Sequence, residues 1–291
     1  MILALDIGGS KISAARIEDG GIVERHQVPM RYNEEAFLAA VREVADFGRP
    51  PERVAVAATG FLHDGKVFSV NINTIPFWKG FPLQAVLRRQ FACPVVMLND
   101  AQAAAWGEYL PRRDRVNNLL FITLSTGVGG GLICDGQLRT GPHGLAGHIG
   151  HASVSIPPLD APVPPCGCGR TDCLEHVASG TALARQAQAL LGKPMDSRGL
   201  FSRIPQDERA AAIVDNAARA VAQAIANCLM LMDIEEAVIG GSVGLAADMI
   251  ERIRRELDGL PALFRLPVSR AIAGADAGLL GAADWALRAA S

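Results

Sequence analysis

Residues 1–17, MILALDIGGSKISAARI, hold a short apolar strand that runs into an aspartate, two glycines and the start of a second strand. A carboxylate at the end of a buried strand is costly unless a partner or ligand compensates it. The glycines allow a tight turn with exposed N–H groups, and the Ser-Lys pair adds a hydroxyl and a positive charge. The pattern suits phosphates and their hydrated Mg²⁺, although an exposed hairpin turn would look similar, and the Walker A spacing is absent. The candidate residues are Asp6, Gly8, Gly9, Ser10 and Lys11.

The same arrangement returns at residues 118–134, NLLFITLSTGVGGGLIC. We expect a strand over 118–124, a glycine-rich turn over 125–131 and another strand over 132–134. Glycines and hydroxyls together can form a backbone nest for an anion, and the strand that follows disfavours a dinucleotide-binding fold. The repetition predicts an internally duplicated α/β architecture. The candidate anion-binding residues are Ser125, Thr126, Gly127, Gly129 and Gly130.

The rest of the chain alternates between helical and strand patterns. We expect helices over 34–47, 81–91, 101–109, 179–191, 207–232, 245–258 and 277–289, and strands over 53–58, 94–98 and 237–239. Gly240 and Gly241 follow the last strand, where glycine permits close approach of a flat ring or phosphate, as a simple strand–helix turn also would. Segment 111–117 is the best candidate linker between two lobes, and 156–165 is a Pro-rich loop.

Asn99 and Asp100 close a buried strand and open a helix. Aspartate at this point is often an N-cap, which is the commoner use. The functional alternative is a general base at the carboxyl end of a strand, where α/β sheets place their ligands. In that case Asp100 would deprotonate a sugar hydroxyl as it attacks a γ-phosphate, and Asn99 would hold a neighbouring hydroxyl.

Cys166, Cys168 and Cys173 lie within eight residues and follow two histidines, His148 and His151. Three cysteines and one histidine can complete a closed, tetrahedral zinc site, which leaves no open position for an activated water. Such zinc would be structural and would fix a loop. The alternative is a knot with no bearing on substrate. The isolated cysteines, Cys93, Cys134 and Cys228, are expected to be small buried hydrophobic residues.

Composition excludes several classes of function. Of 291 residues, 49% are hydrophobic and 20% charged, and the net charge of -2 offers no basic field for nucleic acid or an anionic membrane. No apolar run is long enough for a transmembrane helix, and the N-terminus does not have the pattern of a signal peptide. We therefore expect a cytoplasmic protein.

Together these motifs resemble those of the ROK family (repressors, open reading frames and sugar kinases), over the whole chain. Residues 6–11 match the family's first phosphate motif, 125–131 its second, and Gly240-Gly241 its adenosine motif. The string C-G-C-G-x-x-x-C-x-E at 166–175 matches a highly specific family signature. The resemblance implies the actin-like ATPase (ribonuclease H-like) fold, with two α/β lobes and a cleft between them. The expected lobes are 1–115, joined by the C-terminal helix 276–291, and 116–275, which carries the zinc loop.

The resemblance also implies roles for individual residues. It makes the chain a kinase with MgATP as co-substrate, a structural zinc, and Asp100 as catalytic base. The implied zinc ligands are His151, Cys166, Cys168 and Cys173. The implied sugar contacts are Gly60, Asn73, Asn99, Asp100, His148, His151 and Glu175. Small-molecule sugar and ATP are the expected partners, in a homodimer.

The expected substrate is inferred from His148, within GLAGHIGH at 144–151. Most family kinases carry Glu at this position, and the bacterial members that act on N-acetylmannosamine resemble this chain in having His. The resemblance thus implies phosphorylation of the 6-hydroxyl of N-acetylmannosamine, in sialic acid catabolism. A kinase for glucose, fructose or N-acetylglucosamine is the alternative. A sugar-responsive regulator is a further one, although the family's repressors have an added winged helix and this chain begins at the first phosphate motif.

Two features depart from the family pattern. Ser10 stands where the family usually has Thr, which keeps the hydroxyl. The loop between His151 and Cys166 is longer and richer in proline than usual, so its path and its substrate contacts are not predicted.

Overall fold

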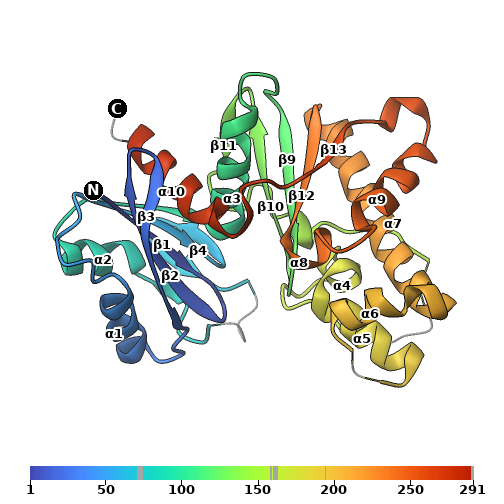
Figure 1. Ribbon diagram of the computed structural model, residues 1–291, viewed down its shortest axis with the longest axis horizontal. Coiled ribbons are helices and arrows are strands. Elements are labelled where there is room, and N and C mark those ends of the chain that lie inside the picture. The colour runs from blue at the N-terminus through green and yellow to red at the C-terminus, as the bar shows by residue number, and fades with distance from the viewer. Residues whose placement is uncertain (71–74, 158, 160–162, 194, 290–291) are drawn as a thin grey trace. The chain divides into compact units, whose positions relative to one another are not determined.

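A computed structural model describes residues 1–70, 75–157, 159, 163–193 and 195–289 (Figure 1). Over these residues the chain divides into two compact units. The first unit comprises Met1–Arg113, Leu138–Ala146 and Ala275–Ser291, and the second comprises Asp114–Gln137 and Gly147–Gly274. The inclusion of 138–146 in the first unit is not foreshadowed in the sequence. Its cause is local, because Gln102 donates to the carbonyl of Ala146 at 2.9 Å.

The first unit is built on a sheet of order β3-β2-β1-β4-β8. The strands are β1 (Ile2–Ile7), β2 (Lys11–Glu18), β3 (Gly21–Pro29), β4 (Arg53–Ala58) and β8 (Val95–Asn99). β1 pairs antiparallel with β2 and parallel with β4, and β4 pairs parallel with β8. The carboxyl ends of β1, β4 and β8 therefore share one edge of the sheet.

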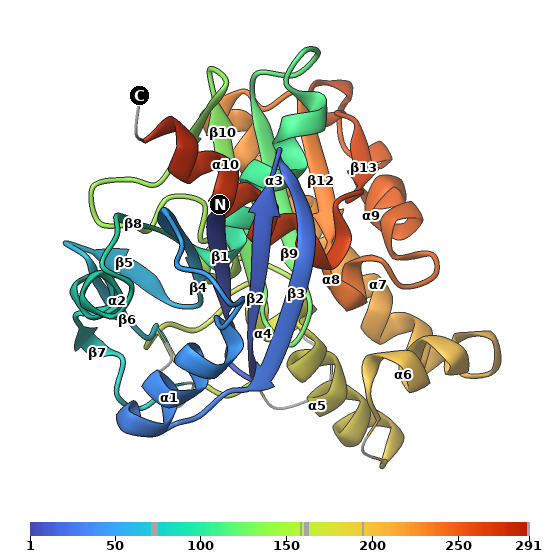
Figure 2. The ribbon, with the colours of Figure 1, turned by 60° about the vertical axis from the view of Figure 1, so that its left-hand side comes forward.

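Helices cover both faces of this sheet because its strands present apolar residues on both faces. Leu3 and Leu5 of β1 belong to the core beneath α1 (Glu34–Val44) and α2 (Leu83–Phe91). Ala4 faces the other way and packs with Leu279 and Ala283 of α10 (Ala277–Arg288). In Figure 2, α10 lies behind the strands, beside α3 (Asp100–Tyr109), which it contacts closely. A three-stranded sheet, β5 (Phe61–His63), β6 (Lys66–Phe68) and β7 (Lys79–Phe81), completes the described part of this unit.

The second unit repeats the plan, with a sheet of order β11-β10-β9-β12-β13. Its strands are β9 (Leu119–Leu124), β10 (Val128–Cys134), β11 (Gln137–Arg139), β12 (Glu236–Gly240) and β13 (Val268–Arg270). As in the first unit, the first strand pairs antiparallel with the second and parallel with the strand that returns to it. The predicted duplication is thus visible in strand order and direction.

The core of the second unit lies between β9 and a layer of helices. The long helix α7 (Glu208–Met232) runs through this core, where Ile213, Val221 and Ile225 are fully buried. The other elements of this unit are α4 (Glu175–Ala178), α5 (Gly180–Leu191), α6 (Ser197–Arg203), α8 (Gly241–Gly244), α9 (Met249–Asp258) and the short 3-10 turns η2 (Ile149–His151), η3 (Ile204–Gln206) and η4 (Ala262–Phe264). The turn η1 (Leu110–Arg112) belongs to the first unit, and η5 (Gly274–Asp276) lies where the chain passes from the second unit to the first.

Several predicted boundaries are wrong. β10 begins at Val128, so most of the predicted turn 125–131 is strand. The helix expected over 34–47 ends at Val44, and the one expected from 81 begins at Leu83 because Phe81 is in β7 and Pro82 precedes the helix. The helix expected over 245–258 begins at Met249. The elements β5 to β7, β11, β13 and α6 lie where the sequence predicts no helix or strand.

Candidate functional site

The carboxyl edge of the first sheet gathers polar side chains. Asp6 lies one residue before the end of β1, Thr59 follows β4, Asn99 is the last residue of β8, and Asp100 follows it. The pairings of Ile7 with Ala58 and of Ala58 with Asn99 bring these strand ends together. Two carboxylates at one sheet edge form a site for cations or for proton transfer.

Asn99, rather than Asp100, is the N-cap of α3. Its Oδ1 accepts from the backbone N–H groups of Ala101 at 3.0 Å and Gln102 at 3.1 Å. Its Nδ2 donates to the carbonyl of Gly60 at 2.7 Å and to Oδ1 of Asp100 at 2.9 Å. The capping alternative considered for Asp100 is therefore wrong, and Asp100 is the first helical residue. The predicted contact of Asn99 with a sugar would require exchange of one of these bonds, because each position of its amide is used.

The Asp100 carboxylate is held from three sides. Its Oδ1 accepts from the Ala101 N–H at 2.8 Å and from Asn99, and the hydroxyl of Thr59 also binds the carboxylate. Burial raises the pKa of Asp100, and these hydrogen bonds oppose that shift. A carboxylate with fixed orientation and raised pKa has the properties of a general base. Thr59 was not predicted, because a threonine after a strand has no distinctive sequence signal.

Asp6 has a raised pKa as well. Burial and the nearby negative charge of Asp100 raise the pKa of Asp6 to about 6, and the positive charges of Lys11 and Arg25 oppose this. Two neighbouring carboxyl groups with raised pKa values are stabilised as anions by a cation between or beside them. The carboxylates therefore suit Mg²⁺ with its phosphates.

The first glycine turn is tight. Gly8 N–H donates to the carbonyl of Lys11 at 3.0 Å, and the hydroxyl of Tyr32 donates to the carbonyl of Gly9 at 2.9 Å. Ser10 and Lys11 are exposed, and the Lys11 ammonium donates to Oε1 of Gln27 at 3.2 Å.

Gly60 and Asn73 are two further predicted residues. Gly60 has φ +87°, and a Cβ there would lie 2.2 Å from the carbonyl oxygen of Phe68, so this position requires glycine. Asn73, predicted as a sugar contact, lies outside the described residues.

The second unit has its own pair of turns at the carboxyl ends of β9 and β12. Gly241 has φ +82°, and a Cβ there would lie 2.2 Å from the carbonyl oxygen of Leu124, so the backbones are in close contact. The Ser242 N–H donates to the hydroxyl of Ser125 at 3.2 Å. The predicted adenosine turn and the second phosphate turn are therefore adjacent.

The second turn itself is short. It spans Ser125 to Gly127, with Thr126 exposed at its tip. Gly129 and Gly130 belong to β10, although they were predicted to be part of the turn. A Cβ on Gly130 would lie 2.7 Å from the carbonyl oxygen of Gly147, so this glycine serves chain packing.

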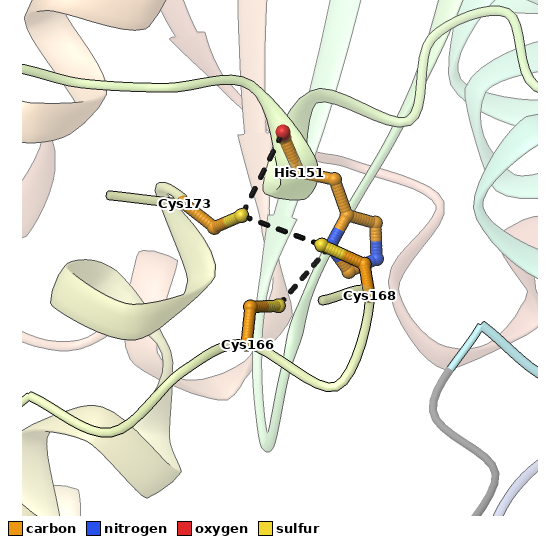
Figure 3. A group of neighbouring side chains, drawn as sticks. All are labelled: His151, Cys166, Cys168 and Cys173. Atoms are coloured by element: carbon orange, nitrogen blue, oxygen red, sulfur yellow. Dashed lines mark hydrogen bonds between the residues drawn. The ribbon is translucent and has the colours of Figure 1, made fainter. Parts of the chain in front are cut away.

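His151, Cys166, Cys168 and Cys173 converge, as predicted (Figure 3). Their potential ligand atoms all lie within 4.8 Å of one another. Nδ1 of His151 is 3.5 Å from Sγ of Cys166, and Sγ of Cys168 is 3.6 Å from Sγ of Cys173. Tetrahedral zinc with bonds of about 2.3 Å to sulfur would separate two sulfurs by about 3.8 Å, so the donor set and its spacing fit zinc.

Within the cluster, the thiol of Cys173 holds its proton firmly. Burial and hydrogen bonds with the neighbouring cysteines raise the pKa of Cys173 to about 12. A divalent cation stabilises thiolates and would offset this cost. The arrangement can therefore hold a metal, and four protein donors leave it closed.

Two chain segments meet at the cluster. Ser153 and Cys173 form an antiparallel bridge, and the N–H of Leu174 donates to the carbonyl of Ala152 at 3.0 Å. Glu175, two residues beyond Cys173, accepts the N–H of Val128 at 3.0 Å through Oε2. This link between the cluster and the second turn was not predicted, because residues 47 apart in sequence give no sign of it. His148, half-buried, precedes η2 in the other segment.

The chain is similar to known sugar kinases over nearly its full length. The model of the ROK family matches residues 2–289. The N-acetylmannosamine kinase of Vibrio cholerae serotype O1 is 40% identical over 284 residues, covering 97% of both chains. The enzyme of that name from Yersinia pseudotuberculosis is 41% identical over 290 residues, covering 98% of this chain and 97% of the relative. A ROK glucokinase from Streptomyces griseus, solved with glucose and AMPPNP, superposes with a TM-score of 0.81 at 31% identity, covering 99% of both chains.

These relatives have the actin-like ATPase fold, and the duplicated sheets of this chain are the same architecture. No helix in the described part of the chain is both long and apolar enough to cross a membrane. The family model spans nearly the whole chain, including both glycine turns, the paired carboxylates and the Cys₃His cluster, so the chain belongs to the ROK family.

Proposed function

We propose that this protein is an ATP-dependent kinase that phosphorylates N-acetylmannosamine on its 6-hydroxyl. The observation that carries the proposal is the Asp100 carboxylate, fixed by Asn99, Thr59 and the Ala101 N–H at the carboxyl edge of a sheet. The choice of sugar is supported by relatives 40–41% identical over nearly the full chain, all named for this activity.

The chemistry asked of the protein is limited, because phosphoryl transfer depends mainly on positioning and charge neutralisation. Asp100 would accept the proton of the sugar hydroxyl as it attacks the γ-phosphate. Asp6 would face the hydrated Mg²⁺ of ATP, with Lys11 near the phosphates. In the second unit, Ser125 to Gly127 and Gly241 would receive the nucleotide, by analogy with the glucokinase that was solved with AMPPNP.

The Cys₃His cluster would hold zinc through His151, Cys166, Cys168 and Cys173. Zinc there supplies rigidity, since the four protein donors leave no position for a reactive water. His148 and Glu175 flank the cluster in sequence, and we assign both to recognition of the sugar. We assign Gly60, Asn73 and Asn99 to the same pocket, and we expect a cytoplasmic homodimer.

The base assignment is tested by Asp100→Asn. General-base catalysis accelerates a reaction about 10²–10⁴-fold, so kcat should fall at least about 10²-fold. Binding of N-acetylmannosamine, measured by calorimetry, should persist, because the amide keeps the size and most hydrogen bonds of the side chain. Asp19→Asn, in an exposed hairpin turn, is the matched control and should retain full activity. Near-normal kcat in Asp100→Asn would contradict the assignment.

A further inference from the structure

Val128 is the first residue of β10, directly after the second phosphate turn, and its peptide groups are held on two sides. On one side, its N–H donates to Oε2 of Glu175 at 3.0 Å. On the other, its carbonyl oxygen lies against Gly150, where an added Cβ would be only 2.1 Å away. The backbone at this point therefore has little freedom as long as both neighbours keep their places.

Both neighbours belong to the segments that supply the ligands of the Cys₃His cluster. Gly150 immediately precedes His151, and Glu175 follows Cys173 by two residues. The segments are joined by the Ser153–Cys173 bridge and by Arg170, which donates to the carbonyl of His151 at 3.1 Å. A metal in the cluster would bond to both segments at once and fix their separation.

Other contacts hold the first part of the turn. Gly180 N–H donates to the carbonyl of Ser125 at 2.7 Å, and the hydroxyl of Thr181 donates to the carbonyl of Thr126 at 2.9 Å. These contacts come from the start of α5. The last position of the turn, Gly127, again faces Glu175, since a Cβ there would lie 2.6 Å from its Oε2. The exit of the turn into β10 is thus controlled by Glu175 and Gly150.

We propose that the metal cluster positions the nucleotide-binding turn, with Glu175 as the positioning residue that transmits metal occupancy to Val128. Glu175 then has a role that is independent of sugar: its carboxylate orients the peptide at which the turn becomes a strand. The nucleotide part of this inference rests on the proposed kinase function, whereas the link from metal to Val128 does not.

The experiment compares metal-loaded and metal-stripped protein without sugar, using two readouts. Hydrogen exchange reports on the Val128 amide directly, and calorimetry gives the Kd of ADP. In the loaded wild type the Val128 amide should be protected. Removing zinc should speed its exchange and raise the Kd of ADP about tenfold, as expected for loss of a hydrogen bond to a charged group.

Two variants separate positioning from simple structural damage. Glu175→Ala, kept zinc-loaded, should show the faster exchange and weaker ADP binding of the stripped wild type, and stripping it should add little. Glu175→Gln keeps an oxygen acceptor for the Val128 N–H, so it should restore both readouts. Glu235→Ala is the matched control, because Glu235 accepts the N–H groups of Asn117 and Asn118 at 2.7 Å, at the other end of β9. It should leave both readouts unchanged.

Each outcome decides the matter. Val128 exchange and ADP affinity that match wild type in loaded Glu175→Ala would overturn the inference, as would equal losses in Glu175→Gln and Glu175→Ala. If the stripped protein unfolds, the loaded variants still give the answer. If neither the wild type nor any variant binds ADP, the proposed kinase function is wrong. Exchange of the Val128 amide then still tests the link between the metal and Val128.

Discussion

Asn99 and Asp100 show how adjacent residues divide two tasks at the start of one helix. The sequence presents an acidic residue at a helix start, which is equally typical of a cap and of a base. In the structure Asn99 makes the capping hydrogen bonds, so Asp100 is left with an oxygen that is not needed for the helix. Sequence alone could not assign the cap, because both residue types are good N-caps.

Asp6 provides a prediction about stability and pH. The pKa of Asp6 is raised to about 6 in the fold, from an ordinary value near 4. Its favourable contribution is therefore complete below pH 4 and is lost as the pH rises through 6. Asp6→Asn should make the ligand-free protein more stable at pH 8, by at most about 3 kcal/mol, with the gain vanishing near pH 4. Urea unfolding at the two pH values measures this.

The control for this prediction is Asp64→Asn, in the same unit. The Asp64 side chain is 82% exposed, so its substitution should shift stability little at either pH. An Asp6→Asn variant that is less stable than wild type at pH 8 would show that burial does not destabilise the ionised carboxylate of Asp6. Saturating MgATP should reverse the order, because the cation favours the ionised wild-type carboxylate.

At the scale of elements, the glycine-rich stretch 125–131 explains a wrong boundary. Glycine runs predict turns, yet Gly130 and its neighbours form the start of β10. Their lack of side chains serves packing against residues 147–150, since a Cβ on Gly130 would meet the carbonyl of Gly147. Such a close approach between segments distant in sequence is invisible to local pattern analysis.

The crossing of α3 and α10 supports a prediction about packing. A Cβ on Gly281 would lie 1.9 Å from the carbonyl oxygen of Ala103, in the helix that begins with Asp100. Gly281→Ala should force the helices apart and cost about 1–3 kcal/mol, measured by denaturant unfolding. Because α3 carries Asp100, kcat should fall too.

Gly278→Ala is the matched control in the same helix. A Cβ there meets nothing closer than Ala57 Cβ at 3.8 Å, which is ordinary contact. Replacing a helical glycine should then stabilise the fold by about 0.5–1 kcal/mol. Equal stability changes in the two alanine variants would show that the helix crossing tolerates a larger separation.

At the scale of the whole molecule, the duplication was predictable because the same local sequence pattern occurs twice in the chain. Each repeat has an apolar strand, a glycine turn and a second strand. In the structure, three strands of each unit have the same order and direction. The Cys₃His cluster was predictable for the same reason, since its cysteines are close in sequence. Thr59 and the Glu175–Val128 contact were not, because they depend on how separate strands and loops meet.

The central claim is the activity itself, so the decisive measurement is a panel of sugars with MgATP and coupled detection of ADP. The account predicts that kcat/KM is highest for N-acetylmannosamine, with glucose, fructose and N-acetylglucosamine clearly poorer. It also predicts N-acetylmannosamine 6-phosphate as the product. A preference for glucose, or no ADP release with any sugar, would contradict it.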